Sequence, residues 1–174
     1  LFLYFLILLS SIAFSQTKPL VIPQNINLPK DTIISNRLIK SLNGFLAQKE
    51  NPNKENTFVL NEDLLETSIL LDEMKEIEKS AKFQDDNFYK GYLTNVVQLD
   101  GDNFLIQFSY IGVTENAPVL KASFEVLAKQ KDGTFYFLSP LKRNTSSWKT
   151  KKIGDFAFHF KNNINEKYTN DFVK

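Results

Sequence analysis

The chain contains no cysteine among its 174 residues. That absence excludes disulfide bonds, thiolate metal sites, a cysteine nucleophile and a lipid anchor on a cysteine within these residues. Histidine is almost as scarce, because His159 is the only one. A zinc site takes three or four ligands, so the sequence predicts no metal centre and no cofactor. We interpret His159 as a packed or hydrogen-bonded side chain of a strand.

Motifs for catalysis are also missing. The six glycines are scattered, so no glycine-rich loop is available to hold a phosphate. No serine is marked out as the nucleophile of a Ser-His-Asp arrangement. Asp85-Asp86 places two carboxylates before a predicted strand, and we interpret them as loop residues rather than a general base. The sequence thus assigns no catalytic residue, and it leaves open whether the protein is an enzyme.

An excess of charge of either sign is absent as well. The 21 basic and 20 acidic residues are well mixed and leave a net charge of +1. A protein that binds nucleic acid usually carries a basic patch, so we expect no nucleic-acid partner. Lys142-Arg143 near Trp148 is too small a cluster to change that expectation.

The first residues are typical of an export signal. Leu1 to Leu9 are unbroken apolar sequence, and Ala13-Phe14-Ser15 is a small-x-small triplet of the kind that signal peptidases cleave. Residues 1–15 are therefore predicted to be the remnant of a signal peptide, cleaved between Ser15 and Gln16. The alternative is a retained anchor, although a bilayer-spanning helix needs about 20 apolar residues. We expect the protein to be exported to the periplasm, the cell surface or the medium, and to meet a membrane only through an uncleaved signal segment.

Residues 16–30 carry Pro19, Pro23 and Pro29. Because proline fixes φ and favours an extended conformation in its predecessor, we predict a stiff, extended arm here. The chain also begins at Leu1 without a methionine and stops at Lys174 within a developing element. We interpret it as part of a longer protein.

Two amphipathic helices are predicted next. Asp31 is suited to capping the first helix, and a second begins near Asn61. Their apolar residues recur at helical spacing, which indicates one buried face on each. These residues are Ile34, Leu38, Ile39, Leu42, Phe45 and Leu46 in the first helix, and Leu64, Leu70, Leu71, Met74, Ile77 and Ala81 in the second. Leu65 and Ile69 lie outside the second arc, and we expect them to meet a different partner.

From residue 88 the apolar period becomes two, which is typical of strands. Four strands are predicted at about 89–99, 103–113, 118–130 and 133–139, with Asp100-Gly101 and Asp132-Gly133 supplying tight turns. The fold class is therefore α+β, with two N-terminal helices packed on a four-stranded antiparallel meander over residues 31–140. A curved sheet closed by helices can leave a pocket, and Phe108, Tyr110 and Phe124 are candidates to line it. The alternative is that these three side chains simply fill the core.

Residues 141–152 break the alternating pattern and are predicted to be a linker. A new strand follows at 155–161, with Phe156, Phe158 and Phe160 on one side, and a helix is expected from Asn165. We interpret residues 153–174 as the truncated start of a second domain.

Two resemblances bear on these predictions. Two helices followed by a curved meander resemble the nuclear-transport-factor-2-like or cystatin-like class of small cone-shaped domains. That class includes enzymes, ligand binders and accessory domains, so the resemblance implies a fold and not a function. The second covers residues 139–174. Three runs in this segment are similar to the junction before a gluzincin-like peptidase domain of secreted bacterial proteins. They are Ser139-Pro140-Leu141-Lys142-Arg143-Asn144, Trp148-Lys149 and Ile153-Gly154-Asp155-Phe156-Ala157-Phe158-His159-Phe160.

Three hypotheses for function follow. We favour an exported, non-catalytic accessory or binding domain of a larger bacterial envelope or secreted protein, with a downstream domain of the same chain as a possible partner. The second is the N-terminal part of a secreted zinc metallopeptidase, whose His-Glu-x-x-His helix would lie outside these residues. The third is a small-molecule binder or enzyme that uses a cavity in the sheet.

Overall fold

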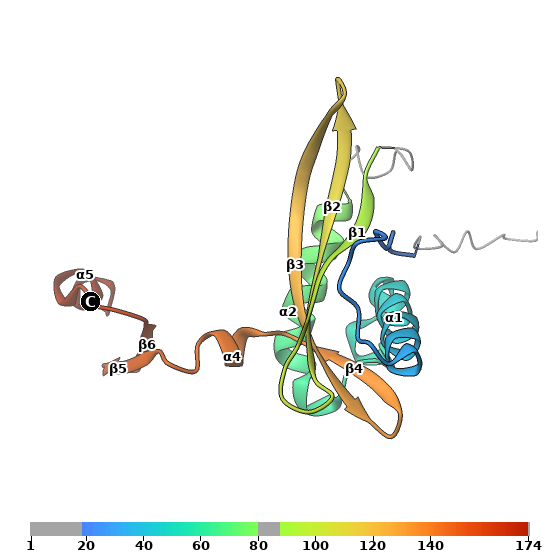
Figure 1. The fold of residues 1–174 in the computed structure, drawn as a ribbon. Coiled ribbons are helices and arrows are strands. Elements are labelled where there is room, and N and C mark those ends of the chain that lie inside the picture. Colours follow the sequence, from blue (N-terminus) through green and yellow to red (C-terminus); the bar gives the residue numbers. More distant parts are fainter. Residues whose placement is uncertain (1–18, 80–87, 174) are drawn as a thin grey trace, which may run out of the picture.

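The computed structural model describes residues 19–79 and 88–173. The predicted signal remnant with its Ser15–Gln16 cleavage site, Ala81, and the Asp85-Asp86 pair therefore lie outside the described residues. The long elements are α1 (Thr32–Ala47), α2 (Leu64–Glu78), β1 (Lys90–Gln98), β2 (Phe104–Thr114), β3 (Ala117–Lys131) and β4 (Thr134–Leu138). They form the predicted α+β fold, with two helices followed by a four-stranded antiparallel sheet (Figure 1).

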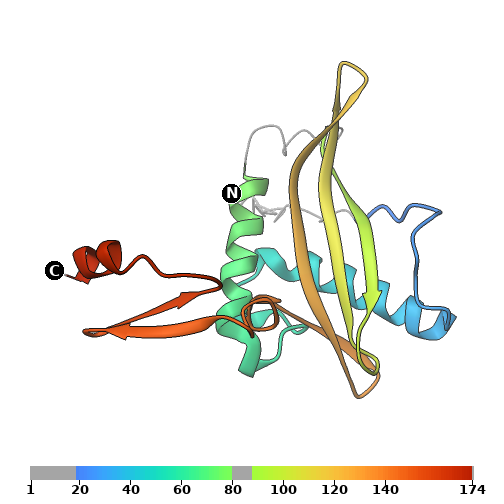
Figure 2. The ribbon, with the colours of Figure 1, turned by 60° about the vertical axis from the view of Figure 1, so that its left-hand side comes forward.

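Helix α1 begins as its sequence predicts. The Asp31 side chain accepts hydrogen bonds from the backbone N–H groups of Ile33 and Ile34, at 2.8 and 3.1 Å. These bonds satisfy two of the donors that a helix N-terminus leaves unpaired. The apolar arc of α1 then packs inward, and α1 crosses behind the strands in Figure 2. Its fully or almost fully buried residues include Leu38, Leu42 and Phe45.

Three short 3₁₀ turns carry the chain from α1 to α2: η1 (Gln48–Glu50), η2 (Asn53–Glu55) and η3 (Asn61–Asp63). Asn56 holds this connection to the end of α1, because its buried side chain donates to the Phe45 carbonyl oxygen at 3.0 Å. The connection also covers the outer edge of β4, where the Phe137 N–H donates to the Phe58 carbonyl oxygen at 2.8 Å. The segment between the helices is therefore part of the packed domain.

Helix α2 buries the predicted stripe only in part. Leu71 and Met74 are fully buried, and Leu64, Leu70 and Ile77 are partly buried against the same core. Leu65 and Ile69 lie on the opposite face, as their places outside the arc predict, and are 80% and 58% exposed.

The sheet has the strand order β1-β2-β3-β4, with every neighbouring pair antiparallel. Consecutive strands are joined by turns, as the predicted meander requires. Gly101, Asp132 and Gly133 have φ values of 64°, 51° and 76°, the left-handed conformation expected of those turns. Leu93, Phe108 and Phe124 are register partners across three strands, and all three are buried.

The buried face of β3 departs from regular alternation at the start of the strand. Regular alternation places Leu120 with Phe124 on the buried face, but Leu120 is 63% exposed. The register shifts between Tyr110 and Ile111, which pair with Ala122 and Leu120, so Lys121 is an extra residue in β3. An extra residue reverses the facing of everything beyond it. Leu120 therefore leaves the core at this bulge.

The proline-spaced arm is packed onto the domain over its described part. Leu20 is 9% exposed within the core, which therefore extends beyond the predicted helices and strands. The Val21 N–H donates to the Gly91 carbonyl oxygen at 2.8 Å, and the Leu93 N–H donates to the Val21 carbonyl oxygen at 3.0 Å. Val21 thus forms a short parallel bridge with Tyr92 at the outer edge of β1.

The region after the sheet is more ordered than a linker. The predicted linker 141–152 contains the short helix α4 (Leu141–Asn144) and most of β5 (Lys149–Ile153). β5 pairs with β6 (Phe156–Phe160), and α5 (Glu166–Val173) follows. These last three elements form a small C-terminal unit that stands away from the rest of the domain (Figures 1 and 2).

Candidate functional site

A buried ionic network joins the two helices to the sheet. The Lys49 ammonium lies 2.8 Å from Glu78 Oε2 and 3.4 Å from Glu50 Oε1, and the Lys49 side chain is only 2% exposed. The Tyr110 hydroxyl, on β2, donates a hydrogen bond to Glu78 Oε1. Each carboxylate oxygen of Glu78 thus has its own donor, as a charge removed from water requires.

Within this network the Tyr110 phenol is held in its protonated form. Burial raises the pKa of the Tyr110 phenol well above its usual value, and the neighbouring Glu78 carboxylate raises it further. A phenol that stays protonated serves as a hydrogen-bond donor and not as a base. The charged atoms of Lys49 and Glu78 are bound to each other, so the network stabilises the contact between helix and sheet.

The sequence contains a sign of this network that is separate from the apolar residues of the two helices. Lys49 lies four residues after Phe45, on the buried face of α1 continued, and Glu78 lies four residues after Met74 on the buried stripe of α2. Opposite charges at the ends of two buried helical stripes predict a partnered ion pair, because an unpaired charge would be costly there.

The three predicted pocket residues pack against one another. The ring centroids of Phe108 and Phe124 are 5.6 Å apart, and Tyr110 lies 6.2 and 5.8 Å from them, within the usual range for aromatic pairs. All three are at most 7% exposed. Two grooves on the described surface are lined by other residues. A pocket lined by Phe108, Tyr110 and Phe124 therefore stays a prediction.

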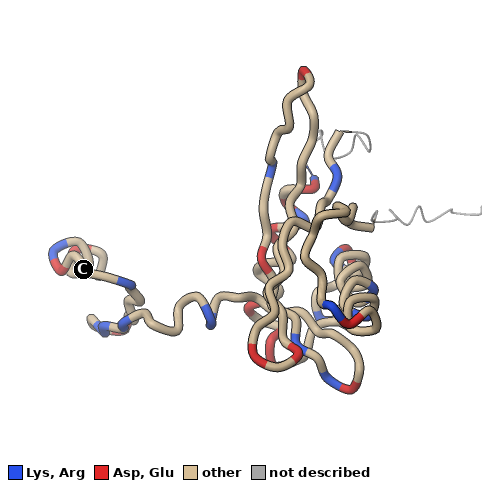
Figure 3. The backbone as a smooth tube through the Cα atoms, viewed as in Figure 1, with Lys and Arg blue, Asp and Glu red and all other residues tan. Residues whose placement is uncertain are grey.

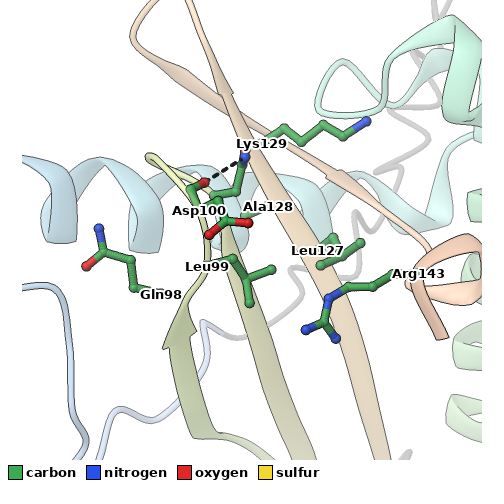
Figure 4. A pocket seen from close by; sticks show the side chains of 8 residues that line it. Gln98, Leu99, Asp100, Leu127, Ala128, Lys129 and Arg143 are labelled. Carbon is green, nitrogen blue, oxygen red and sulfur yellow. Dashed lines mark hydrogen bonds between the residues drawn. The ribbon is translucent and has the colours of Figure 1, made fainter. Parts of the chain in front are cut away.

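The larger groove, of about 530 Å³, lies at the end of the sheet where β1 turns into β2. Gln98, Leu99, Asp100 and Asn103 line it from that turn, Leu127, Ala128 and Lys129 from β3, and Arg143 from α4 (Figure 4). Leu99 and Leu127 are half-buried and Ala128 is fully buried. The groove has an apolar floor and a polar rim.

Local hydrogen bonds fix the turn side of the groove. The Leu99 N–H donates to the Asn103 carbonyl oxygen at 2.8 Å, and the Asn103 side chain donates to the Asp100 carbonyl oxygen at 3.1 Å. The Gln98 amide reaches the Gly101 carbonyl oxygen at 3.3 Å. Gln98 and Asn103 thus donate hydrogen bonds to the backbone of the turn itself. The Asp100 carboxylate lies at the rim of the groove.

The other side of the groove is anchored to α2. The Ser139 N–H donates to the buried Thr67 hydroxyl at 3.2 Å, immediately before α4. Within α4, the Lys142 ammonium lies 3.3 Å from the Glu66 carboxylate. These contacts place Arg143 at the groove.

Two charged groups of the rim are free for a ligand. The Lys129 ammonium is engaged, 3.5 Å from the buried Asp63 carboxylate. Neither the Asp100 carboxylate nor the Arg143 guanidinium has a side-chain partner within residues 19–79 and 88–173. The apolar side chains of Leu99 and Leu127 line the same groove (Figure 4). The rim therefore offers one negative and one positive charge beside an apolar surface.

In the part of the chain that the structure describes, no three His, Asp or Glu side chains are grouped so that they could hold a metal ion. His159 is exposed, and its Nδ1 lies 3.1 Å from the Thr150 hydroxyl across the β5–β6 pair. Among the described helices, none is long and apolar enough to cross a membrane.

Comparisons with known proteins leave the two resemblances as predictions. No family model, no curated protein and no solved structure matches the chain.

Proposed function

We propose that the chain is an exported, non-catalytic binding domain of a larger envelope or secreted protein, and that it binds its ligand in the groove between the β1–β2 turn, β3 and α4. The groove carries the proposal. Its volume of about 530 Å³ falls within the range of about 300 to 1,000 Å³ that is usual for ligand pockets. Apolar lining with a few convergent polar groups is the usual composition of such sites.

The surroundings of the groove favour binding over catalysis. Its polar side chains are a carboxylate, a guanidinium, an ammonium and two amides, and no hydroxyl or imidazole lines it. Asp100 and Arg143 hold opposite charges on separate elements, an arrangement suited to orienting a ligand. Neither group lies beside a nucleophile that it could activate.

The C-terminal unit supports membership of a larger protein. None of the described residues of β5, β6 and α5 is buried, although Phe156 and Phe158 contact Phe172 at centroid distances of 5.5 and 6.0 Å. Tyr168 and Phe172 remain about 70% exposed. Large exposed apolar side chains grouped together are typical of surfaces that another part of a protein covers.

A fragment screen tests the binding function. We would add small acids, amines, amides and alcohols to isotope-labelled protein and map the changes in amide chemical shift. Saturable changes should gather at residues 98–103 and 127–129. Leu99→Glu should abolish them, whereas Val97→Glu, which changes an exposed residue of the preceding strand β1 outside the groove, should not. Scattered changes that ignore the groove, with both variants folded, would refute this function.

A further inference from the structure

The two free charges of the groove narrow the class of ligand. Asp100 lies in the turn after β1 and Arg143 in α4, so they reach the groove from elements far apart in the sequence. A carboxylate recognises an ammonium group, and a guanidinium recognises a carboxylate through paired N–H donors. A ligand that carries both groups would satisfy both sides of the rim at once.

The floor sets what must lie between those two groups. Leu99 and Leu127 line the same groove as the Asp100 carboxylate and the Arg143 guanidinium (Figure 4). Burying part of these side chains gives about 25 cal/mol for each square ångström of apolar surface removed from water. The ligand should therefore present apolar groups between its two charged ends.

We infer that the groove binds short apolar peptides with free ends, placing the ammonium group at Asp100 and the terminal carboxylate at Arg143. The inference rests on the proposed function, since it names the ligand class of the same groove. The nearby Lys129 ammonium does not compete for the carboxylate, because Asp63 already holds it. A simple acid would pair with Arg143 alone and a simple amine with Asp100 alone, so neither would use the whole site.

The test uses three peptides of one shape. The dipeptide Leu-Leu, its N-acetylated form and its C-amidated form are titrated into the full chain by calorimetry, with amide shifts mapping the site. We expect each blocked peptide to bind about tenfold more weakly, since a charged hydrogen bond contributes roughly that factor. The shift changes should fall on residues 98–103 and 127–129.

Variants connect each end of the peptide to one residue. Asp100→Asn should weaken Leu-Leu about tenfold but leave the acetylated peptide unchanged, because the partner charge is already gone. Arg143→Gln should weaken the binding of Leu-Leu about tenfold but leave the affinity for the amidated peptide unchanged. Asp102→Asn, in the same turn, and Lys131→Gln, at the end of β3, remove charges of the same sign outside the groove and should change affinity by less than about twofold.

Two results would overturn the inference. If the three peptides bind the groove with equal affinity, Asp100 and Arg143 do not recognise the charged ends of the peptide, although the groove still binds it. If none of the three shifts the groove residues while fragments of the screen do, the ligand class is wrong and the binding function stands. Failure of both the peptides and the screen at these residues refutes the binding function as well.

Discussion

Replacing Lys49 with methionine removes the buried ammonium and leaves the Glu78 carboxylate with the Tyr110 hydroxyl as its hydrogen-bond donor from this network. The Glu78 side chain is 19% exposed, so little water reaches it. At pH 7 a stranded carboxylate can escape by taking up a proton, which costs about 3.7 kcal/mol from an ordinary pKa of about 4.3. We therefore expect Lys49→Met to lower the free energy of unfolding by about 3 kcal/mol.

Glu78→Leu is expected to cost more. It strands the Lys49 ammonium, which is 2% exposed and keeps only the more distant, half-exposed Glu50. Neutralising a lysine at pH 7 costs about 4.6 kcal/mol from an ordinary pKa of about 10.4, so we expect a loss of about 4 kcal/mol. Removing both charges together takes the Glu78 acceptor away from the Tyr110 hydroxyl, at a cost of about 1–2 kcal/mol.

Urea denaturation of the four proteins at pH 7 measures the double-mutant cycle. The double variant should be more stable than either single variant. Lys79→Met with Glu76→Leu is the matched control, because this pair lies on the same region of α2 but is about 70% exposed. It should show a coupling below about 0.5 kcal/mol. A double variant no more stable than its worse parent would show that the buried charges are independent, and the closed network would be refuted.

Three further predictions follow from single side chains. The pKa of Tyr110 is raised in the folded chain, so its contribution to the free energy of unfolding is present below about pH 10 and is lost as the pH rises. In urea titrations, the free energy of unfolding of the wild-type protein should therefore fall by about 1.4 kcal/mol more than that of Tyr110→Phe between about pH 8 and about pH 11. Phe124→Ala should cost about 3–5 kcal/mol and Glu125→Ala less than about 0.5 kcal/mol by the same assay, and equal effects would contradict the register of β3. Gly44→Ala, which would stabilise an ordinary helix by about 1 kcal/mol, should instead lower the melting temperature, because the new Cβ would lie 2.4 Å from the Phe58 ring; a higher melting temperature would show that this ring moves freely.

The core of the fold could be predicted because its signals are local. Asp31 caps the helix that follows it, and the turns at Gly101 and Gly133 need the left-handed φ that glycine adopts readily. Alternation along β2 and the helical arc of α1 each bury one face wherever the chain packs. These patterns predict the element order and the meander, since neighbouring strands need only short turns.

The failures come from interactions that no single segment encodes. The bulge at Lys121 depends on how β3 fits β2, and only the pairing reveals that Leu120 faces outward. β5 reads as a linker because Lys149-Thr150-Lys151-Lys152 lacks alternating apolar residues. It becomes a strand by pairing with β6 across the turn at Gly154, whose φ is 58°. Positive charge gathers on the C-terminal unit in Figure 3, and the lysines of β5 leave that strand with little apolar signal.

The groove could not be predicted for the same reason. Asp100, Lys129 and Arg143 are common surface residues in their own segments, and only the fold brings a turn, a strand and a short helix together. The buried network left a trace in the helical stripes, whereas the groove left none. The charged side chains at the rim are exposed, and burial imposes no periodic pattern on exposed residues, so the sequence does not mark them.

The groove and the ionic network lie at separate places along β2. Phe104, next to the turn that forms the groove, and Tyr110, in the ionic network, are six residues apart, about 20 Å along a strand. The groove floor is fixed by the core, since Ala128 is fully buried, while its charges lie on an exposed turn and an exposed short helix. Changes at Asp100 or Arg143 therefore remove no buried contact. Loss of affinity in those variants, with unfolding unchanged, measures recognition alone.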